Sequence, residues 1–179
     1  MRWFWIDRFI EFEQAKRAVA VKAVALGEEQ LDDYIPGYPV MPNSLIVEGI
    51  AQTGGLLAGE ISGFRERVVL AKVAKAQFLF PALPGDTLTY TATLVDIKSD
   101  GAICHGTSYI GTRLQAEVEL VFAYLDNARF QGVELFQPAD FLQMLRLLSM
   151  YDVGRKADGS PLDIPPHMLE AEHAVNLGH

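Results

Sequence analysis

Apolar residues occupy nearly the whole circumference of one predicted helix in the first third of the chain. Leucine, isoleucine, valine, alanine and glycine dominate the segment Asn43–Gly59, and a helix that is apolar on most sides is a buried helix. Its polar exceptions, Ser44, Glu48 and Gln52, are four residues apart and therefore form one stripe. The pattern predicts a long central helix with a single polar line, capped by Asn43 or Ser44.

A period of two in the polar and apolar positions predicts strands in most of the remaining sequence up to residue 125. The clearest case is 86–95, where threonines at every second position alternate with Leu88, Tyr90, Ala92 and Leu94. The other expected strands are 17–26, 68–80, 102–110 and 113–125. These patterns predict an α+β fold, in which an antiparallel sheet accompanies one long buried helix.

A proline-rich loop and a C-terminal extension complete the predicted outline. Three prolines between residues 36 and 42 indicate a rigid loop over 32–42, since each proline fixes its own φ and disfavours helix at the preceding residue. Farther along, 138–151 has the pattern of an amphipathic helix and is followed by a loop and an acidic tail. We therefore expect one domain at 1–126 and an extension at 127–179.

Composition narrows the possible partners. The 179 residues include 23 acidic and 15 basic side chains, a formal charge of −8, so neither nucleic acid nor an anionic membrane is an expected partner. The one cysteine, Cys104, excludes an internal disulfide and a thiolate metal site, and the sequence predicts no metal and no cofactor. No apolar stretch approaches the roughly 20 residues of a spanning helix, and the N-terminal residues are unlike a signal peptide. These features predict a cytoplasmic protein.

The run Tyr34–Gln52 resembles the active-site segment of the 3-hydroxyacyl-[acyl-carrier-protein] dehydratases of bacterial fatty-acid synthesis. The family form is roughly His-Phe-Pro-Gly-x-Pro-x-x-Pro-Gly-x-Leu-x-x-Glu-x-x-Ala-Gln. The resemblance continues on both sides, over about residues 1 to 125, and its further segments are Ile6–Arg8, Lys16–Ala18, Lys75–Phe78, Pro84–Asp86 and Ala116–Leu120. It implies the hotdog fold, in which an antiparallel sheet wraps around one long helix, and a homodimer or higher oligomer.

The resemblance also implies a reaction and a substrate class. The family removes water from a (3R)-hydroxyacyl thioester, carried by acyl carrier protein or coenzyme A, and yields the trans-2-enoyl thioester. A histidine takes the proton from C2, and a carboxylate on the central helix, contributed across the dimer interface, handles the leaving hydroxyl. Backbone N–H groups at the start of that helix polarise the thioester carbonyl.

This chain departs from the family at two positions of the motif. Tyr34 stands where the family has its histidine, and Asn43 stands where it has a glycine, whereas Glu48 is retained. A phenol with a pKa near 10 is ionised in only about one molecule per thousand at pH 7, so Tyr34 is expected to donate a hydrogen bond rather than act as a base. Glu48 then serves as acid and base. The remaining residues that the resemblance assigns to substrate binding are Pro36, Gly37, Val40, Asn43, Ser44 and Gln52.

Two other functions stay open from the sequence. In one, the protein is a hotdog thioesterase in which Glu48 activates water or attacks the thioester, and no histidine is needed. In the other, it is a non-catalytic subunit that binds an acyl chain or acyl carrier protein. A purely structural Glu48, satisfied by Ser44 or Gln52, is the simplest alternative to a functional one.

The remaining reactive side chains offer weaker candidates. Cys104 and His105 are adjacent in an expected strand, so their side chains point to opposite faces and do not form a dyad. Two histidines and two glutamates between residues 167 and 173 have metal-ligand spacing, but a solvated acidic tail is the better interpretation.

Overall fold

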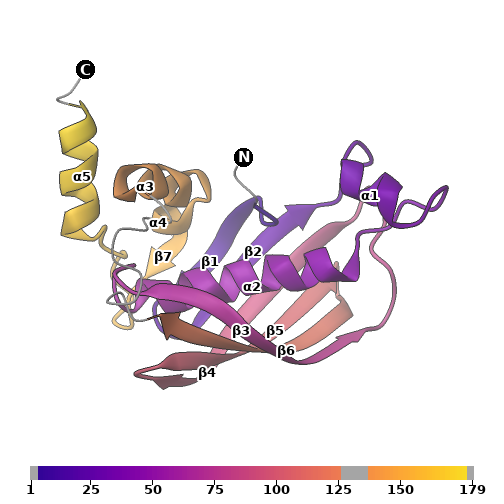
Figure 1. Cartoon of the computed structure of the whole chain (residues 1–179), viewed down its shortest axis with the longest axis horizontal. Coiled ribbons are helices and arrows are strands. Elements are labelled where there is room, and N and C mark those ends of the chain that lie inside the picture. Colours follow the sequence, from indigo (N-terminus) through magenta and orange to yellow (C-terminus); the bar gives the residue numbers. More distant parts are fainter. Residues whose placement is uncertain (1–3, 126–136, 177–179) are drawn as a thin grey trace.

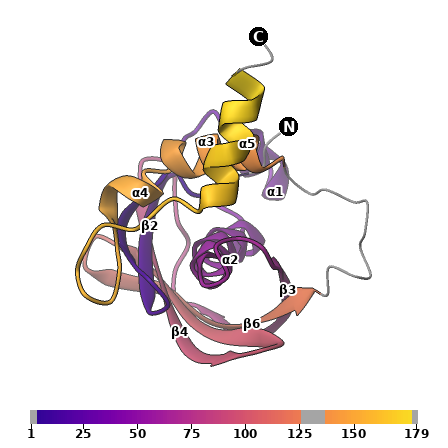
Figure 2. The same cartoon turned by 90° about the vertical axis from the view of Figure 1, so that its left-hand side faces the viewer.

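A strongly curved sheet wraps around helix α2 (Asn43–Glu60), which Figure 2 shows end-on inside the curve. The computed structural model describes residues 4–125 and 137–176, and for 32–34 and 176 it describes the backbone alone. Within these residues the sheet has seven strands in the order β3-β6-β5-β4-β2-β1-β7, and neighbours are antiparallel except β1 and β7. The predicted arrangement of one sheet around one helix is confirmed.

The elements follow one another along the chain as two strands, two helices, four strands and then a mixed C-terminal group. Before α2 come β1 (Arg8–Glu13), β2 (Arg17–Ala23) and α1 (Glu29–Tyr34). After α2 come β3 (Arg67–Phe78), β4 (Thr87–Lys98), β5 (Gly101–Ile110), β6 (Arg113–Leu125), α3 (Pro138–Leu147), α4 (Met150–Val153), β7 (Gly154–Arg155) and α5 (Pro166–Asn176).

The strands form where the sequence alternates. In β4, Leu88, Tyr90 and Ala92 are buried against the core, while the threonines between them face outward. The apolar side chains of α2 complete the core from the other side, and Ile46, Ile50 and Leu57 are fully buried. Each such side chain contributes about 1.5–3 kcal/mol to folding by leaving water. Among the described residues, no helix has both the length and the hydropathy needed to cross a bilayer.

Two helices differ from the sequence prediction. The loop expected from residue 32 begins only at Ile35, because α1 continues through Tyr34 and Leu31 anchors that helix in the core. The helix expected over 138–151 is divided into α3 and α4, because Ser149 adopts a left-handed backbone conformation (φ 56°). A residue at positive φ ends the regular hydrogen bonding of a helix.

The C-terminal extension lies at the end of the molecule opposite α1 (Figure 1). Strand β7 adds to the edge of the sheet beside β1, so the extension shares the sheet of the preceding residues. The segment expected as acidic tail forms helix α5, because Met168 is buried and Arg146 pairs with Glu172. The domain boundary expected at residue 126 lies outside the described residues.

Helix α2 ends in a buried carboxyl group. Glu60, the last residue of α2, is only 7% exposed. Its Oε1 accepts a hydrogen bond of 2.8 Å from Nε2 of Gln14, whereas Oε2 has no hydrogen-bond partner within the described structure. Burial raises the pKa of the Glu60 carboxyl, and the Gln14 hydrogen bond opposes that rise. The neutral acid is therefore the form that the folded protein favours.

We expect Glu60 to make the protein less stable as the pH rises. The folded state binds the Glu60 proton more tightly than the unfolded state. The protonated carboxyl therefore adds fully to the free energy of unfolding below the ordinary pKa of 4.5, and this stabilisation is lost as the pH rises through the higher pKa of the folded state. Glu60→Gln should remove this dependence and raise the free energy of unfolding at pH 8 by about 1 kcal/mol. Urea unfolding of the unmodified protein and of Glu60→Gln between pH 4.5 and 8 measures the pH dependence of the free energy of unfolding. The exposed Glu66→Gln is the control, and a Glu60→Gln protein with unchanged pH dependence would contradict the assignment.

Candidate active site

The start of α2 presents backbone N–H groups without a side-chain cap. Pro42 is the N-cap residue (φ −57°), Asn43 is the first helical residue, and neither Asn43 nor Ser44 acts as the predicted cap. The preceding Met41 is buried and donates its N–H to the carbonyl of Ala82 at 2.9 Å, which fixes the approach to the helix. The first N–H groups of a helix have no acceptor within it and carry the positive end of its dipole, so this terminus can stabilise an oxyanion.

Glu48 lies one turn farther along α2 and is held by Gln52. The Glu48 side chain is half-buried, less enclosed than the apolar sequence around it suggested. Its Oε1 accepts a hydrogen bond of 3.0 Å from Nε2 of Gln52, and Oε1 of Gln52 in turn accepts 2.8 Å from the backbone N–H of Trp5. Because a backbone N–H can only donate, it orients the Gln52 amide so that its NH₂ faces Glu48.

Sequence reasoning missed Trp5. Its contribution is a backbone N–H group that lies 47 positions from Gln52 in the chain, and no side-chain pattern marks such a contact. Gln52 was predicted to bind substrate. In the structure Gln52 hydrogen-bonds with Trp5 and Glu48, so it is also placed to position Glu48.

The loop before α2 carries the other predicted residues. Pro36 and Gly37 are exposed, and Gly37 has a left-handed backbone (φ 78°) that glycine adopts without strain. Val40 is buried, whereas Tyr38 is 52% exposed. Tyr34 is the last residue of α1, directly before this loop, and its side chain lies outside the described residues.

A tight contact sets the distance between α2 and the sheet beside Glu48. A Cβ atom at Gly49 would lie 2.3 Å from Cε2 of Tyr90 and 2.8 Å from the carbonyl oxygen of Trp5. Tyr90 is fully buried, and this burial raises the pKa of its phenol well above the ordinary value, so the ring stays neutral. The glycine next to Glu48 therefore allows the helix backbone to rest on the Tyr90 ring.

The weaker chemical candidates do not join this site. Cys104 and His105 point to opposite faces of β5, as predicted, and burial raises the pKa of the Cys104 thiol to about 12. On the outer face, Nε2 of His105 lies 2.8 Å from Oε1 of Glu117 and lowers the pKa of that carboxyl. The described residues contain no group of three or more potential metal ligands.

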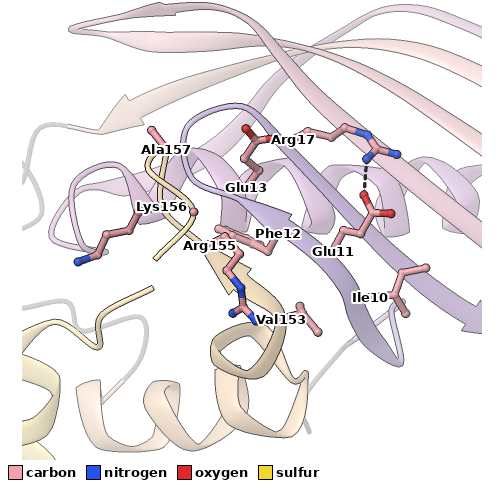
Figure 3. Close-up of a pocket in the computed structure, with 10 residues that line it drawn as sticks. Ile10, Glu11, Phe12, Glu13, Arg17, Val153, Arg155, Lys156 and Ala157 are labelled. Atoms are coloured by element: carbon pink, nitrogen blue, oxygen red, sulfur yellow. Dashed lines mark hydrogen bonds and ion pairs between the residues drawn. The ribbon is translucent and has the colours of Figure 1, made fainter. Parts of the chain in front are cut away.

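A surface pocket of about 300 Å³ lies elsewhere, between β1 and the segment around β7 (Figure 3). Its charged side chains have partners within the protein. Arg17 pairs with Glu11, Lys156 pairs with Asp163, and Nη1 of Arg155 donates to the carbonyl of Gly154 at 2.8 Å. The residues predicted for the active site do not line this pocket.

Comparison with known proteins identifies relatives of the first two thirds of the chain. Residues 3–124 match the family model of the FabA-like domain. The 3-hydroxyacyl-[acyl-carrier-protein] dehydratase FabZ of Koribacter versatilis is 40% identical over 114 residues, which cover 63% of this chain and 73% of that relative. The FabZ of Desulforamulus reducens is 35% identical over 119 residues, which cover 66% and 84%.

Solved structures agree on the architecture. The dehydratase heterocomplex ApeI:P of Xenorhabdus doucetiae matches with a TM-score of 0.59 at 12% identity and covers 70% of this chain and 86% of that one. A Streptococcus mutans protein described as bound to acetyl CoA matches with a TM-score of 0.57 at 16% identity, with coverage of 70% and 93%. At these identities the likeness concerns the fold alone, and it agrees with the expected hotdog architecture.

Two glycines of α2 provide a matched test of the helix–sheet contact. We expect Gly49→Ala to lower the free energy of unfolding by about 1–3 kcal/mol, because the new methyl group overlaps the Tyr90 ring and the Trp5 carbonyl. Gly55→Ala should be neutral or stabilising by up to about 1 kcal/mol, because its Cβ would meet Phe122 at an ordinary 3.6 Å and alanine favours helix. Thermal and urea unfolding measure both, and equal effects would contradict the contact.

Proposed function

This chain belongs to the FabA-like family, and we propose that it dehydrates (3R)-hydroxyacyl thioesters without the histidine that its relatives use. The observation that carries the proposal is the carboxylate of Glu48, which lies on the central helix and is oriented by the Gln52 amide. The curated relatives are named as dehydratases, which favours this reaction over thioester hydrolysis. We propose that the substrate is an acyl thioester carried by acyl carrier protein or coenzyme A. Cytoplasmic location stays a prediction from the sequence.

In the proposed reaction one carboxylate serves both half-steps. Glu48 takes the proton from C2 of the substrate, and negative charge then develops on the thioester carbonyl oxygen. The N–H groups of Asn43 and Ser44 stabilise that charge at the start of α2. The C3–O bond breaks, the hydroxyl leaves with the proton that Glu48 returns, and the products are water and the trans-2-enoyl thioester. Glu48 ends in its starting state, and the Tyr34 hydroxyl donates a hydrogen bond to substrate oxygen.

Gln52 binds one carboxylate oxygen of Glu48, and we propose that the other oxygen faces the substrate. Its NH₂ group donates to Oε1, so we assign Oε2 to the proton transfers. The hydrogen bond also fixes the orientation of the carboxylate, so that the same oxygen meets the substrate in both half-steps.

We further propose that the working unit is a homodimer joined along β3. This strand is at one edge of the sheet, so one side of its backbone is available for pairing. Leu70 and Val73 lie opposite the buried Phe122 and Leu120 on the inner face of the sheet, yet they are 39% and 41% exposed. A second copy added at this edge would cover these side chains and bring its own loop and α2 toward the site. Pro36, Gly37 and Val40 are the residues that we assign to the substrate entrance.

The activity prediction concerns Tyr34. We expect Tyr34→His to raise kcat/KM for dehydration at pH 7 by about 100-fold, because a residue that titrates near neutral pH is a far better base than a phenol. Glu48→Gln should lower the activity of the unmodified chain by about 100-fold or more. The assay follows absorbance of the enoyl thioester formed from 3-hydroxyacyl and consumed from enoyl substrates. Release of free thiol, or tight acyl binding without turnover, would overturn the proposal.

The dimer prediction uses two exposed valines in strands. Val73→Arg should yield a monomer in light scattering coupled to gel filtration, because it places a charge on the inner face of the β3 edge. Val95→Arg is the control, since Val95 is 66% exposed in β4, inside the sheet order. A Val73→Arg protein that remains dimeric would exclude this interface.

A further inference from the structure

Lys22 is a buried lysine outside the candidate site. It is in β2 and only 8% exposed, and lysine is almost never buried unless its charge is paired. Its Nζ donates a hydrogen bond of 2.5 Å to Oε1 of Glu28 and another of 2.7 Å to the carbonyl of Ala23. Oδ1 of Asp7 lies 3.7 Å away, and the Trp5 ring centroid lies 5.9 Å away. The ammonium group thus lies near the segment before β1, at Trp5 and Asp7, and near the segment after β2, at Glu28.

The first of these segments leads to Tyr34. Glu28 is the N-cap residue of α1, and its carbonyl accepts the N–H of the buried Leu31 at 3.0 Å. Its carboxylate binds Lys22 and makes no cap hydrogen bond to the helix. The ion pair therefore ties the first turn of a six-residue helix to the sheet, and that helix ends at Tyr34.

The second segment leads to Glu48. Oδ2 of Asp7 accepts a hydrogen bond of 2.7 Å from the N–H of Ala23. This bond places the N-terminal segment along β2. Two residues earlier, the N–H of Trp5 orients the Gln52 amide that holds Glu48. Lys22 therefore contacts the two segments on which the placement of Glu48 and Tyr34 depends.

The buried phenol of Tyr90 lies near the same two carboxylates. The Tyr90 side chain is fully buried, and its hydroxyl has no hydrogen-bond partner in the described part of the chain. Burial raises the pKa of this phenol, and the charges of Asp7 and Glu28 raise it further. Lys22 supplies the cation that pairs with Glu28, whose side chain is only 19% exposed, and it also lies near the more exposed Asp7.

We propose that Lys22 is a positioning residue of the active site, which holds the N-terminal segment and the start of α1 against β2 so that Gln52 meets Glu48 and α1 delivers Tyr34. Its effect on turnover rests on the proposed function. Its effect on the two segments does not.

The main experiment compares Lys22→Met with Lys22→Arg and with Lys16→Met. Methionine keeps the apolar stem and removes the charge, arginine keeps the charge, and Lys16 is an exposed lysine of the same hairpin that pairs with Glu13. We expect Lys22→Met to lower kcat about 10- to 100-fold with a much smaller change in KM, Lys22→Arg to restore most of it, and Lys16→Met to change neither. An unchanged kcat in folded Lys22→Met would overturn the proposal.

A second measurement requires no activity. Amide hydrogen exchange followed by NMR should be at least about 10-fold faster at Trp5 and Leu31 in Lys22→Met, while the amides of β5 and β6 keep their protection. Unchanged exchange at Trp5 and Leu31 would overturn the inference even if the enzyme is active. Faster exchange in a protein that turns over no hydroxyacyl thioester would support the positioning role of Lys22 and would count against the proposed reaction instead.

A milder variant covers the case in which Lys22→Met does not fold. Glu28→Gln keeps the size of the side chain and one acceptor oxygen and leaves Lys22 beside Asp7. It should speed exchange at Leu31 and leave Trp5 protected, because only the tie to α1 is weakened. Equal protection at both residues, as in the unmodified chain, would contradict the role of the ion pair.

Discussion

The contact between the α2 backbone at Gly49 and the ring of Tyr90 is the constraint on which the rest of the site depends. A helix can rest this closely on a sheet only where a side chain is missing, and the missing Cβ would overlap both Tyr90 and the Trp5 carbonyl. The contact sets the rotation of α2 about its axis as well as its distance from the sheet. As a consequence, the polar stripe that includes Glu48 stays half-exposed while the apolar residues of the helix are buried.

Three polar side chains near this contact, those of Glu48, Gln52 and Lys22, belong to interactions that join segments distant in the sequence. Gln52 joins Glu48 to the backbone of Trp5, and Lys22 joins the same N-terminal region to Glu28. In a poorly solvated interior an unpaired polar group is costly, so each of these contacts restricts the others. The carboxylate thus has a defined orientation although it is on a helix that is otherwise almost wholly apolar.

The two ends of α2 have different roles. Its N-terminal end receives the proline-rich loop and, in the proposed reaction, offers its N–H groups to the substrate. Its C-terminal end, at Glu60, is buried and hydrogen-bonded to Gln14, and shortly beyond it Phe64 packs against Phe141 of the C-terminal extension. Strand β7 pairs with β1 at one edge of the sheet, whereas β3 is the last strand at the opposite edge within the described residues. In the proposed homodimer, a second copy adds at this β3 edge.

The sequence by itself determined the central helix and the strands from residue 86 to 125, and through resemblance it indicated Glu48, Tyr34 and Asn43 as candidate site residues. These features depend on local periodicity or on a continuous motif, and both can be read along the chain. Tertiary structure alone decided that Trp5 orients Gln52, that Lys22 is buried, and that α5 docks through Met168. Each of those outcomes depends on a contact between residues that are far apart in the sequence, and such contacts exist only once the sheet has closed around α2.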